Sequence, residues 1–304
     1  MKIRKGFSPG KERVVLTIGF FDGVHLGHQK IIGDVVKEAK LRGIKSCVVT
    51  LDRHPSKLFS HRSVPLLTSQ EEKERIMYQL GVDLVQIFPF TLRFASLSPY
   101  QFLCKLKQSF NFEQIIVGED FVFGQGRKGN VKLLHQVKND FGYELVAIPS
   151  LKLKGEKISS SLLRQWLGKG EIEKVTRWMG RYPTILGEVI EGDRRGRTLG
   201  YPTANLRPHP QKLLPSPGVY AGKVKLMGKT YRTLINVGDK PTFKDFSRGI
   251  EAHIFDFSKE IYGQSLRIEL VSKIRDIQTF SSSLELISRL EKDKEEAERI
   301  VEIK

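Results

Sequence analysis

The first half of the chain alternates between short apolar runs and stretches whose apolar residues recur every three or four positions. The apolar runs are typical of strands in a buried parallel sheet and lie at 14–18, 47–51, 84–88, 114–117 and 145–148. Helical spacing appears between them, at 31–39, 71–80, 99–110 and 131–140. This alternation predicts an α/β domain in which helices cover both faces of a parallel sheet.

The pattern changes after Pro183. Short apolar stretches at 185–191, 219–226, 231–237, 251–255 and 266–271 are separated by loops rich in glycine, proline and aspartate. Such a succession predicts an antiparallel barrel or sandwich. Ser282 and Glu285 form a capping-box pattern in front of a charged amphipathic helix that runs to about 302. We therefore expect two domains, residues 1–183 and 184–304.

Composition narrows the class of protein. The chain has 304 residues, with 39% hydrophobic and 28% charged, as in globular proteins. No apolar run approaches the roughly 20 residues of a membrane span, and we expect no signal peptide. Cys47 and Cys104 stand alone in apolar settings, which favours a reducing cytoplasm over a disulfide scaffold. The net charge of +17 suits either anionic partners or a scattered lysine surface.

The stretch GFFDGVHLGH, residues 19–28, directly follows the first predicted strand. Its glycines let the backbone bend tightly and approach a ligand. His25 and His28 share one face at the start of the next helix, where free N–H groups and the helix dipole attract phosphate. Imidazoles there can stabilise the charge that builds during phosphoryl or nucleotidyl transfer. A zinc site is disfavoured because no third ligand is near, and a plain helix cap is the alternative.

A second anion-binding pattern is KISSS, residues 157–161, in front of a helix with Arg164 one turn in. Hydroxyls and a basic side chain at a helix start bind anions, although the same residues also suit a simple N-cap. The pairing of HxGH with KxSSS resembles the nucleotidyltransferase superfamily, whose members transfer a nucleotide from ATP.

Longer stretches resemble one family along nearly the whole chain. GFFDGVHLGHQ, VGEDFVFGQGRKGN and ISSSLLRQWLGKGEIE are similar to the adenylyltransferase module of the bifunctional bacterial riboflavin kinase/FMN adenylyltransferases, also called prokaryotic FAD synthetases. GRTLGYPTANL, PSPGVYAG, INVGDKPTF and IEAHIFDF are similar to the kinase module of that family. The resemblance implies a Rossmann-like nucleotidyltransferase domain, followed by a six-stranded antiparallel Greek-key barrel with a C-terminal helix.

The resemblance also implies the chemistry. Riboflavin is phosphorylated to FMN with ATP, and FMN is then adenylylated with a second ATP to give FAD and pyrophosphate. Both steps use a divalent metal, usually Mg²⁺. The expected partners are riboflavin, FMN and ATP, with no nucleic acid and no membrane, in the cytoplasm; no oligomeric state is predicted.

For adenylyl transfer, the resemblance implies that His25 and His28 hold the ATP phosphates in the transition state. Ser159, Ser160 and Arg164 are expected to close on the phosphates from the other side. The remaining binding residues implied for this site are Gly19, Phe20, Asp22, Gly23, Asp120 and Phe121. Phe121 and its neighbour Phe123 would support the flavin, with an ordinary core position as the alternative.

For the kinase step, the resemblance assigns the general base to Glu251 of the ExH motif, because a hydroxyl is a poor nucleophile until its proton is removed. Thr203 and Asn205 match the Mg²⁺ ligands, and hard oxygen donors suit that ion. The nucleotide loop around them is expected to contain Gly196, Arg197 and Gly200. The alternatives are a solvated strand glutamate at 251 and a plain turn after Pro202.

Two other functions compete with this interpretation. A class I aminoacyl-tRNA synthetase-like enzyme would share HLGH, KISSS and a basic charge, but the barrel motifs argue against it. An RNA-binding protein is disfavoured because no RNA-recognition aromatic signature appears.

The stretch GKVKLMGKT is not a P-loop, because five residues rather than four separate Gly222 from Gly228. Gly228 is instead expected to serve a hairpin turn.

Overall fold

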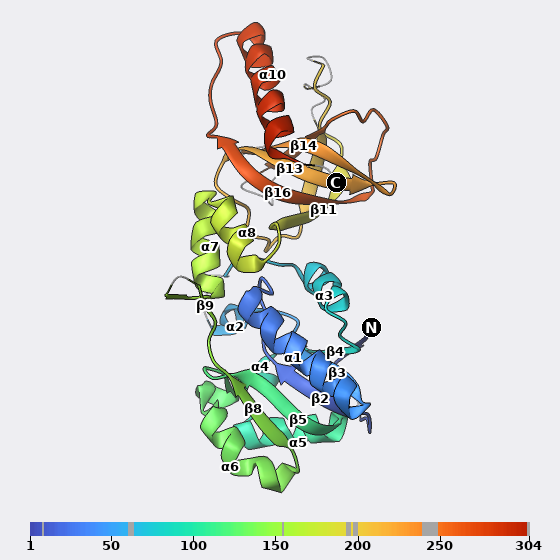
Figure 1. Cartoon of the computed structure of the whole chain (residues 1–304), viewed down its shortest axis with the longest axis vertical. Coiled ribbons are helices and arrows are strands. Elements are labelled where there is room, and N and C mark those ends of the chain that lie inside the picture. Colours follow the sequence, from blue (N-terminus) through green and yellow to red (C-terminus); the bar gives the residue numbers. More distant parts are fainter. Residues whose placement is uncertain are drawn as a thin grey trace. The chain divides into compact units, whose positions relative to one another are not determined.

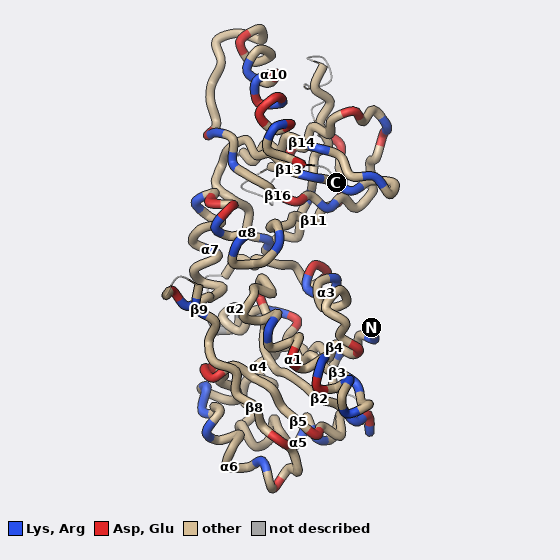
Figure 2. Tube along the Cα trace, in the orientation of Figure 1, with Lys and Arg blue, Asp and Glu red and all other residues tan. Residues whose placement is uncertain are grey.

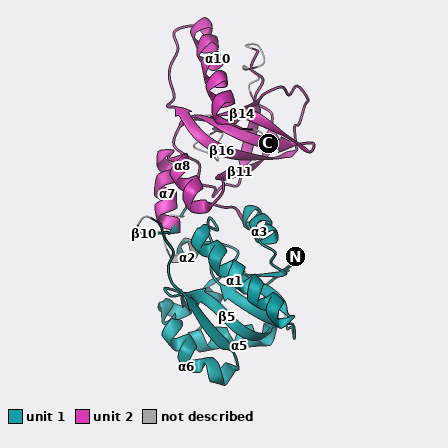
Figure 3. Cartoon of the chain, viewed as in Figure 1, with its two compact units in different colours: residues 1–66, 70–159 teal, residues 67–69, 160–304 magenta. Residues whose placement is uncertain are grey.

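The structure, a computed structural model, describes residues 1–7, 9–59, 64–153, 155–192, 196, 200–238 and 249–302. The chain divides into two compact units (Figure 3), one made of residues 1–66 and 70–159 and the other of 67–69 and 160–304. These units are defined by packing, and a functional boundary at 183/184 stays a prediction.

A six-stranded sheet in the order β1-β4-β3-β2-β5-β8 forms the centre of the first unit (Figure 1). Every neighbouring pair is parallel. The strands are β1 (Lys2–Lys5), β2 (Arg13–Ile18), β3 (Lys45–Leu51), β4 (Leu84–Phe88), β5 (Asn111–Gly118) and β8 (Glu144–Ile148). The order runs outward in both directions from β2, so the switch point where such sheets bind ligands lies at its carboxyl end.

Helices cover both faces of this sheet, as predicted. Buried residues of α1 (Leu26–Arg42) and α3 (Gln70–Gln79) pack with Val48 and Val85 on one face. Those of α5 (Pro99–Ser109) and α6 (Val131–Phe141) pack with Leu16 and Val49 on the other. The shorter helical elements are α2 (Ser56–Phe59), α4 (Leu92–Ala95) and the 3-10 turn η1 (Gln125–Arg127). Two small hairpins pair β6 (Val122–Phe123) with β7 (Gly129–Asn130), and β9 (Lys152–Leu153) with β10 (Glu156–Lys157).

The second unit contains a closed antiparallel barrel in the order β11-β12-β15-β14-β13-β16. Its strands are β11 (Thr184–Ile190), β12 (Ala204–Pro208), β13 (Gly218–Leu226), β14 (Lys229–Gly238), β15 (Gly249–Ile254) and β16 (Ser265–Arg275). The helices α7 (Ser160–Lys169) and α8 (Ile172–Met179) precede it, and α10 (Ser283–Ile300) follows. The barrel and its closing helix confirm the expected fold class.

Three local expectations have clear outcomes. Met227 and Gly228 join β13 to β14 with positive φ angles of 49° and 80°, so this stretch is a hairpin, as expected. Asn205 lies within β12, so the alternative of a plain turn after Pro202 is wrong for that residue. The capping box is only half formed: Ser282 caps α10, but the Glu285 carboxylate accepts from Ser281.

Charge is dispersed over the molecule. Figure 2 shows Lys and Arg along both units, with Asp and Glu interspersed. Cys47 is buried and Cys104 is half-buried, and both are free thiols. Within the described part of the chain, no helix combines the length and apolar character needed to span a membrane.

Candidate active sites

The turn that follows β2 has an unusual backbone. Phe21 and Val24 have positive φ angles of 54° and 37°, and Gly23 lies between them at 81°. A non-glycine residue in this region costs about 1–3 kcal/mol and persists only where its surroundings hold it. Gly19 is needed because the Phe21 ring folds back over it, and a Cβ there would lie 2.8 Å from that ring. Asp22 is almost fully buried within the same turn.

The two histidines meet at the start of α1. His25 is the N-cap, and its Nδ1 accepts the backbone N–H of His28 at 3.3 Å. The rings stack with centroids 3.6 Å apart, and the Phe21 ring meets His28 edge-on at 5.2 Å. Because Nδ1 accepts, the neutral His25 ring carries its proton on Nε2, where it can be donated to a phosphate oxygen. His25 is therefore a helix cap and an anion-site candidate at once.

The structure connects the GEDFVFG stretch with the KISSS stretch. Lys157 Nζ donates to Asp120 Oδ2 at 2.6 Å, and both side chains are about half exposed. Such an exposed pair contributes little to stability, but it shows that the two segments lie side by side. Ser159 ends the first compact unit, whereas Ser160 opens α7 in the second with Arg164 one turn on. Their approach to the histidine pair stays a prediction.

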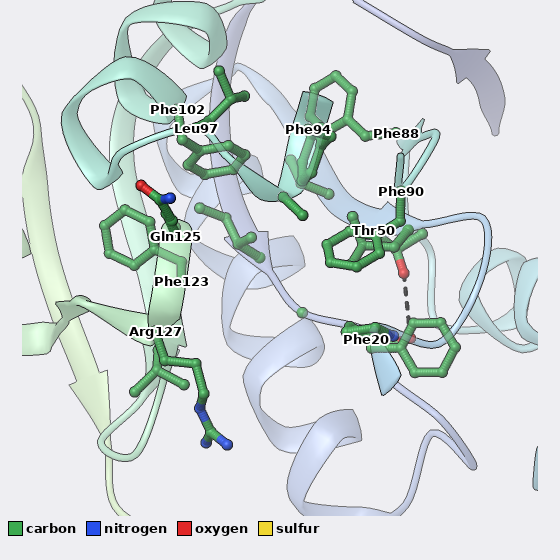
Figure 4. Close-up of a pocket in the computed structure, with 18 of the residues that line it drawn as sticks. Phe20, Thr50, Phe88, Phe90, Phe94, Leu97, Phe102, Phe123, Gln125 and Arg127 are labelled. Atoms are coloured by element: carbon green, nitrogen blue, oxygen red, sulfur yellow. Dashed lines mark hydrogen bonds between the residues drawn. The ribbon is translucent and has the colours of Figure 1, made fainter. Parts of the chain in front are cut away.

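A cavity of about 1050 Å³ opens beside the turn that follows β2 (Figure 4). Gly19 and Phe20 form part of its wall, and Phe121 and Phe123 stack at 5.4 Å on another part. The remaining aromatic lining residues are Phe88, Phe90, Phe94 and Phe102, with polar atoms from Thr50, His54, Ser56, Gln125 and Arg127. A mostly apolar wall with few polar groups is typical of a small-molecule site. Of the wall residues named here, sequence reasoning found only Gly19, Phe20, Phe121 and Phe123.

The barrel aligns a second polar group. Glu251 on β15 lies directly opposite Asn205 on β12 and opposite Asn236 on β14. Directly opposed residues of antiparallel strands project from the same face, so the three side chains form one row. Ile250 and Ala252, which alternate with Glu251, are fully buried and face the other way, into the barrel. Asn236 lies in the INVGDKPTF stretch, but sequence analysis gave it no role, because only the strand register places it beside Glu251.

His253 ties this row to the preceding loop. Its Nδ1 lies 2.9 Å from the carbonyl oxygen of Pro202 and donates to it, because a carbonyl only accepts. Burial lowers the pKa of His253 below its ordinary value, against the opposing effect of that hydrogen bond. Thr203, half-buried, follows Pro202 at once and leads into Asn205, which is only 7% exposed.

Both glycines of the expected nucleotide loop, Gly196 and Gly200, are among the described residues. The Tyr201 N–H donates to the carbonyl of Gly196 at 2.8 Å, and a Cβ at Gly196 would lie 2.3 Å from the Tyr201 carbonyl oxygen. Gly200 has a φ of 84°, which an L side chain rarely adopts. Arg197 lies outside the described residues.

The first unit places a helix start with two histidines at the switch point of a parallel sheet, and the closed barrel carries a row of one carboxylate and two amides. Such features are typical of enzymes that transfer phosphate groups. Residues 8–162 match the family model described as FAD synthetase, and residues 179–301 match the one described as riboflavin kinase. The chain belongs to the family of bifunctional riboflavin kinase/FMN adenylyltransferases.

Named relatives match along nearly their whole length. The chain is 38% identical to the bifunctional riboflavin kinase/FMN adenylyltransferase of Bacillus subtilis, over 94% of this chain and 92% of the relative. It is 34% identical to that of Escherichia coli, over 93% and 91%. A crystal structure of a Streptococcus pneumoniae protein named as a macrolide-efflux protein has a TM-score of 0.88 at 29% identity, covering 97% of this chain and 98% of that one.

Proposed function

We propose that the chain uses the two sites described above for the two reactions of its family. As a member of that family it phosphorylates riboflavin to FMN and adenylylates FMN to FAD. In the proposal, the His25–His28 turn serves adenylyl transfer and the Glu251 row serves phosphorylation. The observation that carries this assignment is that Glu251 lies directly opposite Asn205 in the barrel. Both residues belong to the part of the sequence that matches riboflavin kinase, and the two histidines do not.

Adenylyl transfer needs alignment more than a base. A phosphate oxygen of FMN attacks the α-phosphorus of ATP, the bond to the β-phosphate oxygen breaks, and pyrophosphate leaves. The attacking phosphate is already an anion, so the site must hold two anions together and stabilise the extra charge of the transition state. His25, His28 and the first N–H groups of α1 supply donors of the right kind. Ser159, Ser160 and Arg164 complete the proposed phosphate site.

The FMN ring system fits the cavity beside the turn. The cavity is large, mostly apolar and rich in aromatic side chains, and Gly19 and Phe20 connect its wall to the histidine turn. An isoalloxazine ring is flat and partly apolar, and aromatic walls favour such a group through stacking and burial. Phe121, stacked on Phe123, is proposed to contact it, while Asp120 sits at the preceding position.

Replacing Phe121 with alanine is expected to raise the KM for FMN roughly three- to tenfold, equivalent to about 0.5–1.5 kcal/mol of lost aromatic contact. The KM for ATP and riboflavin phosphorylation should be unchanged. Steady-state kinetics with each substrate varied separately measure this. Tyr100→Ala is the matched control, because Tyr100 is an exposed ring on α5 outside the cavity wall. An unchanged FMN KM in the Phe121 variant would place the flavin elsewhere.

Phosphorylation of riboflavin needs a base. In the proposal the Glu251 carboxylate takes the proton of the ribityl 5′-hydroxyl, whose oxygen attacks the γ-phosphorus of ATP as ADP leaves. The Thr203 hydroxyl and the Asn205 amide oxygen are hard donors that fit Mg²⁺, and Asn205 is held by β12 next to Glu251. When bound, the ion would neutralise charge on the ATP phosphates.

The free thiols of Cys47 and Cys104 agree with the proposed cytoplasmic location.

The decisive test follows the flavins directly. The pure chain is incubated with riboflavin, ATP and Mg²⁺, and the flavins are separated by chromatography over time. FMN should accumulate first and FAD later, with release of ADP and then pyrophosphate. Riboflavin that remains unchanged would reject the function. ATP–pyrophosphate exchange that depends on an amino acid would instead support the synthetase-like alternative.

The double role of His25 allows stability and catalysis to be separated. His25→Ala removes the N-cap of α1 and should destabilise the protein by about 1 kcal/mol. His25→Asn restores an N-cap acceptor but no imidazole, so stability should recover while FAD formation stays low. Thermal unfolding and FMN adenylylation of both variants measure the two effects. Full activity in His25→Asn would show that the residue serves only as a cap.

A further inference from the structure

Lys73 is a buried cation that the chemistry above does not use. It lies on α3 and is only 2% exposed. Its Nζ donates to the carbonyl oxygen of Phe20 at 3.3 Å and lies 4.2 Å from the centroid of the Phe20 ring. Burying an ammonium group is unfavourable unless it is well compensated, so a lysine at this position needs a reason. The residue that it contacts belongs to the histidine turn and to the cavity wall.

The Phe20 carbonyl is held from two sides. Besides Lys73, the hydroxyl of Thr50 on β3 donates to the same oxygen at 3.2 Å (Figure 4). Two donors from separate elements fix the orientation of the peptide that joins Phe20 to Phe21. Phe21 is the first of the two residues with a strained positive φ, and such a conformation survives only where neighbours hold it.

Phe21 links the fixed Phe20–Phe21 peptide to the start of α1. Its ring packs over Gly19 on one side and meets the His28 ring edge-on on the other. A rotation of the Phe20–Phe21 peptide would move this ring, and His28 with it. Lys73 is therefore connected to the histidine pair through a single strained residue, without lining the cavity itself.

The carboxylates around Lys73 favour its charged form. Those that interact with it are Asp22 in the turn, Asp52 after β3 and Glu74 on α3 itself. Asp22 is itself only 2% exposed, so the ammonium also balances a buried charge inside the turn. The cation thus acts on the turn twice, through a hydrogen bond to Phe20 and through the charge of Asp22.

We propose that Lys73 is a positioning residue for adenylyl transfer, which holds the strained turn so that the histidine pair and the start of α1 face the ATP phosphates. This inference rests on the proposed use of that turn. Lys73 touches no substrate, and its loss should therefore lower kcat for FMN adenylylation more than it changes the KM for FMN. A misplacement of about 1 Å at a reacting centre can reduce the rate about 100-fold.

The charge of Lys73 gives the proposal a pH signature. Burial lowers the pKa of Lys73 to about 8, although the nearby carboxylates raise it. Above that pH the ammonium becomes a neutral amine, so FMN adenylylation should fall on the alkaline side. The unfolded chain, with a lysine pKa near 10.5, binds more protons than the folded chain between about pH 8 and 10.5. This group therefore makes the fold more stable as pH rises, so the activity loss should occur without unfolding.

The experiment compares the full-length Lys73→Met and Lys73→Arg variants with Lys132→Met, which removes an exposed lysine from α6. Lys73→Met should lower kcat for FMN adenylylation about 10- to 100-fold, with the KM for FMN within about threefold of wild type and riboflavin phosphorylation unchanged. Lys73→Arg, which stays charged at high pH, should retain more activity than Lys73→Met and move the alkaline fall upward by more than one pH unit. Lys132→Met should match wild type.

Two results would overturn the proposal. One is a Lys73→Met variant whose kcat stays within twofold of wild type. The other is a Lys73→Arg variant whose alkaline fall has the same midpoint as that of wild type, and this test applies even where Lys73→Met folds poorly. Wild-type protein is assayed alongside, and a failure of wild type to make any FAD would count against the proposed function itself.

Discussion

Replacing Glu251 with glutamine is expected to lower riboflavin phosphorylation by about 10²–10⁴-fold while leaving FMN adenylylation intact. Glutamine keeps the size of the side chain and its place in the row between Asn205 and Asn236, but it cannot accept the proton of the ribityl hydroxyl. The loss should appear in kcat, because the base acts in the transition state rather than in binding. Chromatographic assays that start from riboflavin and from FMN measure the two activities separately.

The matched control for this prediction is Glu188→Gln. Glu188 is an exposed glutamate on β11 of the same barrel, paired with Arg207 at the surface, so its loss should affect neither activity. Thermal unfolding of both variants checks that the barrel is intact. Equal loss of both activities in Glu251→Gln would contradict the assignment of phosphorylation to this row. So would a kinase rate close to that of wild type.

The regular elements were predictable because their periodicity is strong. Five of the six parallel strands were expected, and the helices between them begin and end within a few residues of the expected positions, with Gly43 ending α1 in a left-handed conformation. The strand that was missed there, β1, reads KIRK and lies at a sheet edge, where no long apolar run is needed. In the barrel β12 was missed, since PTAN looks like a turn.

The sites were predictable only where neighbours in sequence are neighbours in space. The histidine turn can be recognised because its glycines and imidazoles are adjacent in the sequence. The ExH and PTAN motifs are local in the same way. The cavity is different, because its phenylalanines come from four separate segments and only the fold brings them together. Lys73 was missed because a lysine on an amphipathic helix is normally solvated. Asn236 was missed because strand register cannot be derived from the strand alone.

The two sites solve different problems with different elements. An anionic nucleophile needs fixed donors, and in the proposal the start of α1 supplies them without rearrangement. A neutral alcohol needs a base, and the proposed base is a carboxylate that lies between two amides on adjacent strands. Because neither solution uses the residues of the other, the two activities should be separable by single substitutions.

The second large effect is therefore expected at His28. His28→Ala should lower FMN adenylylation by about 10²–10³-fold, the usual effect of removing one donor that stabilises transition-state charge. Riboflavin phosphorylation should continue, so FMN should accumulate as the end product when riboflavin and ATP are supplied. Helix α1 should remain capped, because the cap uses the backbone N–H of residue 28 and the side chain of His25. Chromatography of the flavins over time shows the block directly.

The control for this variant is His135→Ala, which removes an exposed histidine from α6 of the same unit. It should form FAD at the wild-type rate. Alanine at 28 also removes the ring that Phe21 meets, so His28→Gln, which keeps bulk and a donor, should recover part of the rate. FAD formation at the wild-type rate in His28→Ala would remove the imidazole from the mechanism. Loss of both activities there would mean that the sites depend on each other.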